Sequence, residues 1–324
     1  MLRMIKGLLC VALVTTLACL AAAGQLTVTS PSTGDYLGTS NTLTFQITGA
    51  TYQTTVTATI NGASGTTIST SKFTPNSSGE ISGSLPITFA TTAPAGDYTI
   101  TVNATSPGTT FNTEVVTVHV IVQAPKFLDF SPISGRYVNG TVKVRATIDD
   151  ANLKNWKVQV DNADIPNNTG TSTTVAVDWD STLATNNTSH TIKITATDLA
   201  GNTASQSVSV TVDRTKPTIT VTYPQSSVAV IAGAEIDVVI DISAASSSVI
   251  DQNGIDVLAQ TSSGAYIVRV ARVSAKSLNS TTLRWTGRIR TSAVKLPKTF
   301  NLYTTAIDLA GNVATPSTVT VKLR

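Results

Sequence analysis

The stretch SHTIKITATDLAGN at Ser189–Asn202 decides the fold, because a near copy, TFNLYTTAIDLAGN, stands at Thr299–Asn312. In both copies apolar and polar residues alternate before the loop DLAGN. A second alternating segment follows each loop, QSVSVTVD at Gln206–Asp213 and STVTVKL at Ser317–Leu323. Alternation with a period of two is typical of a β-strand that buries one face. Each copy therefore predicts two β-strands joined by a short loop.

A more distant version of this unit occurs earlier, where GDYTITVNAT at Gly96–Thr105 is followed by EVVTVHVIV at Glu114–Val122. This version lacks DLAGN. When the units are aligned on Ala104, Ala196 and Ala306, they recur roughly every 100 residues, which is the length of a β-sandwich domain and not of a solenoid repeat. We therefore expect three β-domains in a row.

Short segments that contain proline join the units, QAPKFLDFSP at Gln123–Pro132 and DRTKPTITVTYP at Asp213–Pro224. Short, stiff joints favour an extended arrangement over a collapsed one. The linker VDRTKP, the strand ending in ATDLAGN and the closing strand together resemble the bacterial immunoglobulin-like (Ig-like) domains found in tandem on surface proteins. The resemblance is good over Ala124–Arg324 and weaker over Gln25–Gln123.

The resemblance implies an all-β fold of three consecutive Ig-like β-sandwiches. We place domain 1 at residues 24–123, domain 2 at 124–214 and domain 3 at 215–324, after a leading segment 1–23. The resemblance also implies a secreted or surface location. It implies little about activity, because a fold of this kind supports many roles.

The leading segment has the three parts of a secretory signal. Arg3 and Lys6 supply the positive start, Gly7–Leu20 the apolar run, and Ala21–Ala23 the small residues before the cleavage point. We expect export of the chain and removal of this segment. The apolar run is too short to be interpreted as a membrane span.

Both cysteines, Cys10 and Cys19, lie inside the leading segment. The mature chain therefore has no thiol for a disulfide, a nucleophile or a metal ligand. Lipoprotein anchoring through Cys19 is the alternative to free secretion, although Thr16 stands where lipoprotein signals usually carry leucine. No second apolar span follows in the sequence.

The composition argues against an enzyme. Charged residues make up 13% of the chain, against about 25% in an average globular protein. The sequence has two histidines, His119 and His190, each in or beside an expected strand. No serine-hydrolase elbow, zinc-protease motif or phosphate-binding loop appears. We expect a non-catalytic protein with no nucleic-acid partner.

The DLAGN loops are first interpreted as turns. Asp198 and Asp308 are placed to accept hydrogen bonds from amides two or more residues later. Gly201 and Gly311 supply the positive φ that closes such a loop. If either copy does more than turn the chain, we expect it to be the second, because a linker aspartate, Asp213, lies near it.

A calcium site is the more specific interpretation of the second DLAGN loop. The loop between the last two strands lies at the N-terminal end of an Ig-like domain, together with the loop between the second and third strands. This placement gathers carboxylates near the joint of domains 2 and 3, and Ca²⁺ prefers such oxygen ligands. The predicted ligands are Asp213, Asp241, Asp251 and Asp308. No other cofactor is expected.

A basic hairpin in domain 3 is the second candidate site. The segments YIVRVARV at Tyr266–Val273 and TLRWTGRIR at Thr282–Arg290 carry arginines around a tryptophan, a combination that can bind an acidic polysaccharide. A solvated outer strand face, protected by charge from edge pairing, is the simpler interpretation. The candidate residues are Arg269, Arg272, Arg284, Trp285, Arg288 and Arg290.

The remaining aromatic residues fit structural roles. Tyr98 stands where a tyrosine corner would fix the penultimate strand. Because His190 and Phe300 occupy the aligned positions, we do not expect the corner in the later units. Trp156 is predicted to lie in a core and Trp179, between two aspartates, to be exposed.

The sequence therefore predicts a non-catalytic, extracellular structural or adhesive spacer built of tandem Ig-like domains. The alternative is a module that binds an anionic glycan or cell-surface polymer through the basic hairpin. The expected partner is a cell-surface protein or polysaccharide.

Overall fold

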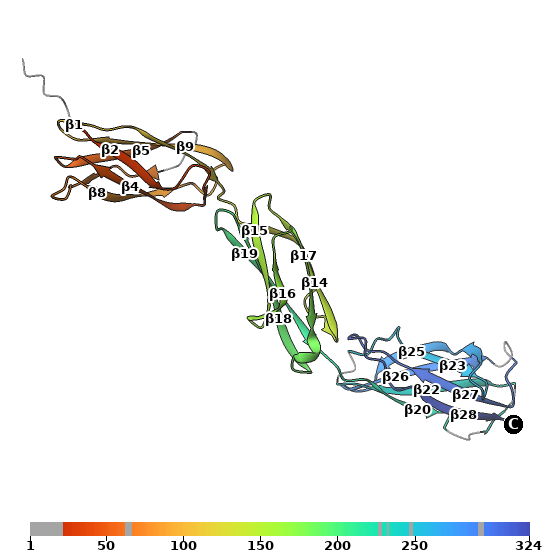
Figure 1. Cartoon of the computed structure of the whole chain (residues 1–324). Helices are drawn as coiled ribbons and strands as arrows, with labels where there is room; N and C mark the ends of the chain where they lie inside the picture. The colour runs from red at the N-terminus through yellow and green to blue at the C-terminus, as the bar shows by residue number, and fades with distance from the viewer. Residues whose placement is uncertain (1–21, 62–66, 226–228, 232, 246–248, 291–294) are drawn as a thin grey trace, which may run out of the picture. The chain divides into compact units, whose positions relative to one another are not determined.

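The computed structural model describes residues 22–61, 67–225, 229–231, 233–245, 249–290 and 295–324 (Figure 1). The proposed signal segment falls almost entirely outside the described residues. Contacts divide the chain into two units, one of residues 1–124 with 199–202, the other of residues 125–198 with 203–324. In the described residues, strands are joined by loops and by one short 3₁₀ turn, Ser181–Leu183. The predicted all-β fold is confirmed.

Domain 1 consists of a four-stranded sheet in the order β2-β4-β8-β6 and a five-stranded sheet in the order β3-β11-β9-β5-β7, with a small parallel pair β1-β10. Alternate residues along these strands are buried, and they form one hydrophobic core between the sheets. The strands are β1 Ala22–Ala23, β2 Gln25–Ser30, β3 Tyr36–Leu37, β4 Ser40–Thr48, β5 Thr54–Asn61, β6 Thr67–Ile68, β7 Ser71–Phe73, β8 Ile81–Thr88, β9 Gly96–Thr105, β10 Thr109–Thr110 and β11 Glu114–Val120.

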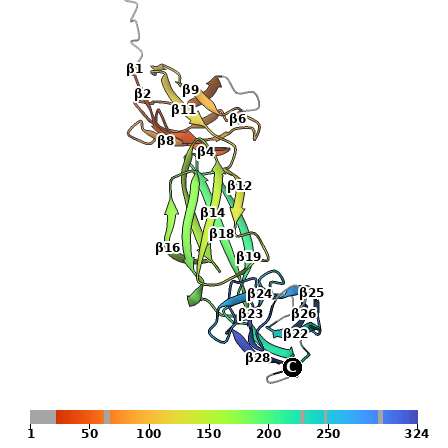
Figure 2. The same cartoon turned by 90° about the vertical axis from the view of Figure 1, so that its right-hand side faces the viewer.

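Domain 2 has a three-stranded sheet, β12-β14-β17, and a five-stranded sheet, β13-β19-β18-β15-β16 (Figure 2). Its core again comes from alternate residues of both sheets. The strands are β12 Lys126–Ser131, β13 Tyr137–Val138, β14 Thr141–Asp149, β15 Leu153–Val160, β16 Ala163–Gly170, β17 Thr174–Asp180, β18 Thr188–Asp198 and β19 Thr203–Val212.

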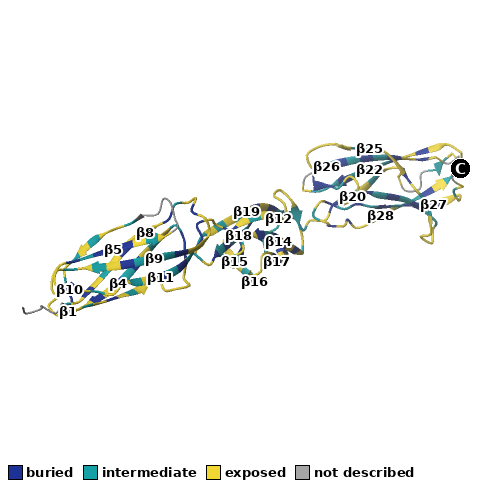
Figure 3. Ribbon diagram, turned by 90° about the horizontal axis from the view of Figure 1, so that it is seen from above, coloured by how far each residue is buried: buried dark blue, intermediate teal, exposed yellow. Residues whose placement is uncertain are grey.

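Domain 3 has a four-stranded sheet, β20-β22-β26-β25, and a five-stranded sheet, β21-β28-β27-β23-β24. A third separate core fills the space between them, and buried and exposed residues alternate along its strands (Figure 3). The strands are β20 Thr218–Tyr223, β21 Ala229–Val230, β22 Glu235–Ser243, β23 Asp256–Gln260, β24 Tyr266–Arg269, β25 Ala271–Ser277, β26 Thr282–Arg290, β27 Thr299–Thr305 and β28 Ser317–Leu323.

The first strand of every domain changes sheets in the same way. Its first part, β2, β12 or β20, pairs antiparallel with the next strand, and its second part, β3, β13 or β21, pairs parallel with the last strand. A cis peptide bond before proline lies at each crossing, at Ser30-Pro31, Ser131-Pro132 and Tyr223-Pro224. Domain 1 therefore shares the topology of the other two, although its sequence matches less well. The exact domain boundaries stay predictions.

The tyrosine corner is present in domain 1, where the Tyr98 hydroxyl donates to the carbonyl of Pro94 at 2.9 Å. The later units have no tyrosine at the aligned position, as expected, but in domain 2 a histidine takes a similar role. There, Nε2 of His190 lies 3.0 Å from the carbonyl oxygen of Thr185. A histidine thus ties the start of the penultimate strand to the preceding loop, as the tyrosine does in domain 1.

Trp179 is 6% exposed, so its predicted exposure is wrong. The alternation of β17 places it on the core face, and both flanking aspartates, Asp178 and Asp180, are on the outer face. Trp156 is also 6% exposed and lies in the core as expected.

Thr304 in β27 places a hydroxyl in the core of domain 3. Its side chain is fully buried, and among the described residues Oγ1 has no hydrogen-bond partner. The aligned positions carry Val102 and Ile194, both fully buried. We expect Thr304→Val to stabilise domain 3 by about 1–2 kcal/mol, because an apolar group of the same shape removes an unsatisfied polar atom. Urea denaturation of wild type and variant measures this gain, and a loss of stability would contradict it.

Candidate functional site

The second DLAGN copy forms a closed turn around the Asp308 carboxylate. Oδ1 of Asp308 accepts hydrogen bonds from the backbone amides of Ala310 at 3.0 Å and Asn312 at 2.8 Å. The amide of Asp308 donates to the carbonyl of Asn312, and Gly311 has a φ of 87°. Asp308 is 3% exposed. Gly201 has a φ of 85°, so the glycine of the first copy adopts the same conformation.

The side-chain amide of Asn312 joins this turn to the linker and to domain 2. Nδ2 donates to the backbone carbonyl of Asp213 and to Oδ2 of Asp308, both at 2.8 Å. Oδ1 accepts from Nδ2 of Asn139, which directly follows β13, at 2.7 Å. Asn312 is 5% exposed. Both hydrogens of the amide are therefore used and its oxygen is satisfied, which is what a buried polar group requires.

The linker itself is hydrogen-bonded to domain 2 at consecutive residues. The amide of Arg214 donates to Oδ1 of Asn186 at 2.7 Å, and the Arg214 guanidinium donates to the carbonyls of Ser181 and Ala184. Oδ1 of Asp213 accepts from the amide of Thr215, two residues later, at 2.9 Å. The residues that follow β19 are thus held by the loop that precedes β18.

The first DLAGN copy makes the equivalent bond to the preceding linker within the first unit. Nδ2 of Asn202 donates to the carbonyl of Ile121 at 2.8 Å. Ile121 occupies the position of Asp213, because each directly follows its last strand and donates its own amide to the short strand beside it. The residue that reaches the linker is therefore the asparagine of DLAGN, in both copies. The recurrence of this asparagine at the same position of both loops is the signal in the sequence that points to its role.

The structure does not gather the four predicted calcium ligands into one site. Asp308 closes its own turn, Asp213 caps Thr215, and Asp251 accepts from the amide of Asn253 at 2.9 Å. Asp241 is engaged by Arg284. Within the described ranges, no three aspartate, glutamate, histidine or cysteine side chains come together as a metal-binding group. Calcium at this joint stays a prediction from the sequence alone.

Four of the five arginines of the predicted basic hairpin face acidic residues on neighbouring strands. In the pairing of β22 with β26, residues of opposite charge stand directly opposite one another. Cross-strand pairs of opposite charge stabilise a sheet and neutralise its face. The three opposed pairs are Arg284 with Asp241, Arg288 with Asp237 and Arg290 with Glu235.

The remaining members of the candidate set are also engaged. Arg269 pairs with Asp256, and Nη1 of Arg272 donates to the carbonyl of Gln252. Trp285 is 2% exposed and lies in the core, so it cannot stack on a ligand. Alternation along β26 places Trp285 on the face opposite to that of Arg284, which explains why the two do not form one surface.

The best-organised of these pairs is Arg284 with Asp241. Nε and Nη2 of the guanidinium donate to both carboxylate oxygens, at 2.8 and 2.7 Å. The hydrogen bonds from Arg284 hold the pKa of the Asp241 carboxyl below its usual value, against the opposing effect of burial. Such a bidentate pair is oriented toward its own partner and not toward an external anion.

His190 is the centre of a buried polar cluster in domain 2. Its Nδ1 lies 2.6 Å from Oδ2 of Asp161, and its Nε2 lies 2.9 Å from the Thr188 hydroxyl as well as near the Thr185 carbonyl. Burial and the Arg214 charge lower the pKa of His190, but the bonds to Thr185 and Asp161 outweigh them and raise it above 6.5. Acceptors on both ring nitrogens favour the doubly protonated ring.

We expect this cluster to make the stability of domain 2 depend on pH. Because the pKa of His190 is raised in the folded domain, its contribution is complete below pH 6.5 and is lost as the pH rises through the folded value. Thermal unfolding from pH 6 to pH 9 should show a falling midpoint for domain 2 in the wild type. His190→Gln, which carries no charge at any pH, should flatten that slope. An equal slope in both proteins would show that the ring is neutral in the fold.

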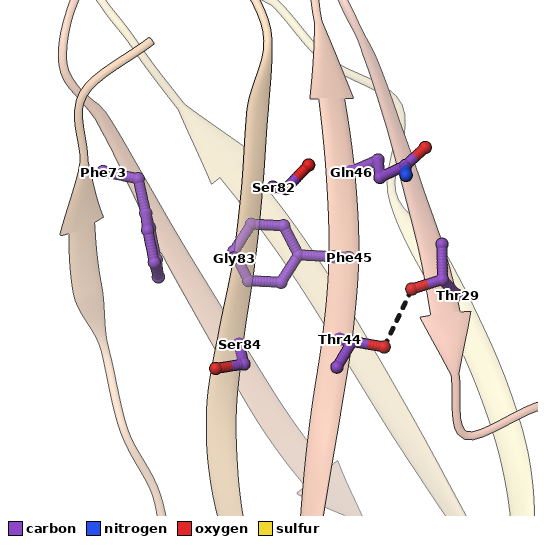
Figure 4. Close-up of a pocket in the computed structure, with 8 residues that line it drawn as sticks. All are labelled: Thr29, Thr44, Phe45, Gln46, Phe73, Ser82, Gly83 and Ser84. Atoms are coloured by element: carbon purple, nitrogen blue, oxygen red, sulfur yellow. Dashed lines mark hydrogen bonds between the residues drawn. The ribbon is translucent and has the colours of Figure 1, made fainter. Parts of the chain in front are cut away.

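A shallow hollow lies over β2, β4 and β8 of domain 1 (Figure 4). The Phe45 ring lies across Gly83, and the Thr29 and Thr44 hydroxyls are hydrogen-bonded to each other at 2.8 Å. Phe45 is 1% exposed, because it faces the core. Phe73, the other aromatic residue of the lining, is only half-buried. The hollow therefore offers hydroxyl and amide groups beside a partly exposed aromatic ring, and none of its lining residues is suited to catalysis.

No protein-family model matches the chain, and no curated protein matches it. Solved structures with some similarity include fibronectin(III)-like modules of Clostridium thermocellum CbhA, with 15% identity over 62% of this chain and 94% of that one and a TM-score of 0.40. A bacterial ice-binding adhesin matches at 19% identity, over 93% and 98% of the two chains, with a TM-score of 0.32. The I9–I11 tandem of titin matches at 12% identity, over 92% and 98%, with a TM-score of 0.30.

These TM-scores are low, so the assignment to the Ig-like fold rests on the strand order of each sandwich. Two sheets face each other, and the first strand pairs with both. The chain is a tandem array of Ig-like domains. In this Ig-like array the described polar clusters are turns, linker bonds and cross-strand pairs. Among the described residues we find no helix with the length and apolar character needed to span a membrane.

Proposed function

We propose that this Ig-like array is a non-catalytic, exported spacer that holds domains 2 and 3 at a fixed angle and presents its ends to a cell-surface protein or polysaccharide. The observation that carries the proposal is the saturated, buried amide of Asn312. That one side chain binds the linker backbone, a loop of domain 2 and the turn of domain 3, all of them within the second unit.

The linker supports the same proposal. A free linker would allow the domains to reorient, because interfaces between domains are usually small and polar. Here Asp213, Arg214 and Thr215 are all hydrogen-bonded, to domain 2 or to one another. These bonds fix the linker to domain 2. Rotation of domain 3 against the linker must then break the bonds of Asn312 to Asp213 and Asn139 and expose a buried amide, so the joint resists bending.

Distance measurements between spin labels test the fixed joint. The predicted mature chain has no cysteine, so Ser207→Cys in β19 and Lys276→Cys in β25 provide two exposed labelling sites. We expect a narrow distance distribution in the wild type and a broad one after Asn312→Ala. The matched control is Asn202→Ala, which removes the same residue from the other DLAGN loop. Equal widths in wild type and Asn312→Ala would refute the fixed joint.

Binding of an anionic glycan through domain 3 gains no support from the structure. Four of the five arginines face acidic partners, the fifth donates to a backbone carbonyl, and Trp285 is buried. The spacer is therefore the function that we propose for the chain.

A further inference from the structure

We propose that the loops at one end of domain 1 form a binding site for a neutral saccharide, with Tyr52 as its aromatic platform. The site is a hollow of about 550 Å³ between the loop that joins β4 to β5 and the loop that joins β7 to β8. This volume lies within the usual range for ligand pockets. The inference is independent of the joint between domains 2 and 3.

The exposure of Tyr52 is the first observation. Its side chain is 61% exposed in a domain whose other large apolar groups are mostly buried. The ring makes no contribution to the core that would explain its position. A tyrosine of this kind offers an apolar face with a polar tip, which suits a ligand that is apolar on its faces and polar at its edges. A sugar ring has this character.

The rigidity of the hollow is the second observation. The Ala50 amide donates to the carbonyl of Gly79 at 2.9 Å, which ties the two loops together. Gly79 has a φ of 76°, and a Cβ there would lie 3.0 Å from the Ala50 carbonyl oxygen, so the close approach requires glycine. The Tyr52 carbonyl accepts from the Thr54 and Ser106 hydroxyls. A pre-formed wall lowers the entropic cost of binding a ligand.

The loop from β7 to β8 is organised by one asparagine. Oδ1 of Asn76 accepts from the amides of Ser78 and Glu80, both at 2.9 Å. Nδ2 of Asn76 donates to the Glu80 carboxylate, which holds that charge against its own loop. The shape of this side of the hollow is therefore set before any ligand arrives.

The chemistry of the lining is the third observation. None of the residues that line the hollow carries a charge. The lining combines hydroxyl and amide groups with one tyrosine and one proline. Hydroxyl and amide groups recognise the hydroxyls of a sugar, whereas a charged ligand would be left without a counter-charge. The polar side chains of the lining include those of Thr51, Gln53, Asn76, Ser77 and Ser78.

Domain 1 also differs from the later domains at this end. In domains 2 and 3 the loop before the last strand is DLAGN, and its asparagine binds the preceding linker. In domain 1 the corresponding asparagine, Asn112, instead binds the backbone of Leu26 in the first strand of its own domain. That end of domain 1 is therefore not organised around a linker carbonyl.

The test is an NMR titration of the full mature chain with a fixed panel of sugars. The neutral probes are the hexasaccharides of cellulose, chitin, xylan, mannan and starch, and the acidic probes are heparin and polygalacturonate hexasaccharides. We expect at least one neutral probe to shift the amides of residues 49–53 and 74–79. Tyr52→Ala should weaken that binding about tenfold or more, and Tyr52→Phe should keep it within about threefold.

The matched control is Tyr266→Ala, which removes a tyrosine of similar exposure, 66%, from domain 3. It should leave the affinity unchanged. The proposal is overturned if no neutral probe shifts these amides at about 5 mM, a concentration that would largely saturate a site with a Kd of about 1 mM. It is also overturned if only the acidic probes bind, or if folded Tyr52→Ala binds as the wild type does. None of these outcomes affects the spin-label result.

Discussion

Replacing Asp308 with alanine is expected to destabilise domain 3 by about 3 kcal/mol. The carboxylate is buried and accepts from the amides of Ala310 and Asn312 and from the Asn312 side chain. Alanine leaves these three donors without acceptors in a site that water does not reach. Because the linker bond depends on the orientation of Asn312, the variant should also loosen the joint.

Hydrogen exchange of the core amides of β27 measures this loss within domain 3. The matched control is Asp251→Ala, because among the described residues the Asp251 carboxylate accepts from the amide of Asn253 alone, and Asp251 is more exposed. We expect the control to cost about 1 kcal/mol or less. If Asp308→Ala costs no more than Asp251→Ala, the turn does not depend on its buried carboxylate.

Replacing Gly170 with alanine is expected to destabilise domain 2 by about 2–3 kcal/mol. Gly170 stands directly opposite Trp156 in the pairing of β15 with β16. A Cβ at this position would lie 2.7 Å from Cε2 of Trp156 and closer still to Cζ2. The ring cannot simply move away, because its Nε1 donates to the Ser172 carbonyl at 2.8 Å.

A double-mutant cycle separates this overlap from a general effect of changing a glycine. Trp156→Phe shortens the ring, so Gly170→Ala should cost less in that background than in the wild type. Scanning calorimetry of the four proteins gives the coupling directly. Equal costs in the two backgrounds would show that the added methyl group does not meet the indole.

The fold could be predicted because its signal is local and repeated. Alternation identifies β18 and β19 from Thr191 to Val212 without any knowledge of their partners, and the DLAGN turn supplies the connection between them. The same alternation identifies Arg284, Arg288 and Arg290 as one face of a strand. It also places Trp285 on the other face of that strand. A surface made of these arginines together with Trp285 is therefore inconsistent with the alternation.

The candidate sites could not be predicted because their partners are distant in the sequence. Arg284 meets Asp241 only once the register of β22 against β26 is known, and that register depends on the packing of the whole sandwich. Likewise, Asn312 reaches the Asp213 carbonyl across 99 positions and Asn139 across 173. His190 was aligned with Tyr98 correctly, but its partner Asp161 lies in a turn that no pattern connects to it.

The asparagine of DLAGN binds a backbone carbonyl of the preceding linker in both copies. This affects how a chain of such domains can gain or lose a domain. The carbonyl is supplied by Ile121 for one copy and by Asp213 for the other, although the two side chains share no chemistry. A duplicated domain thus carries the asparagine that binds the preceding linker, and for this bond the domain before it supplies only a backbone carbonyl. Exchange of domains can then keep this bond without a matched linker side chain, so the side chains at the positions of Ile121 and Asp213 are free to diverge, whereas the contact of Asn312 with Asn139 needs a matched residue in the neighbour.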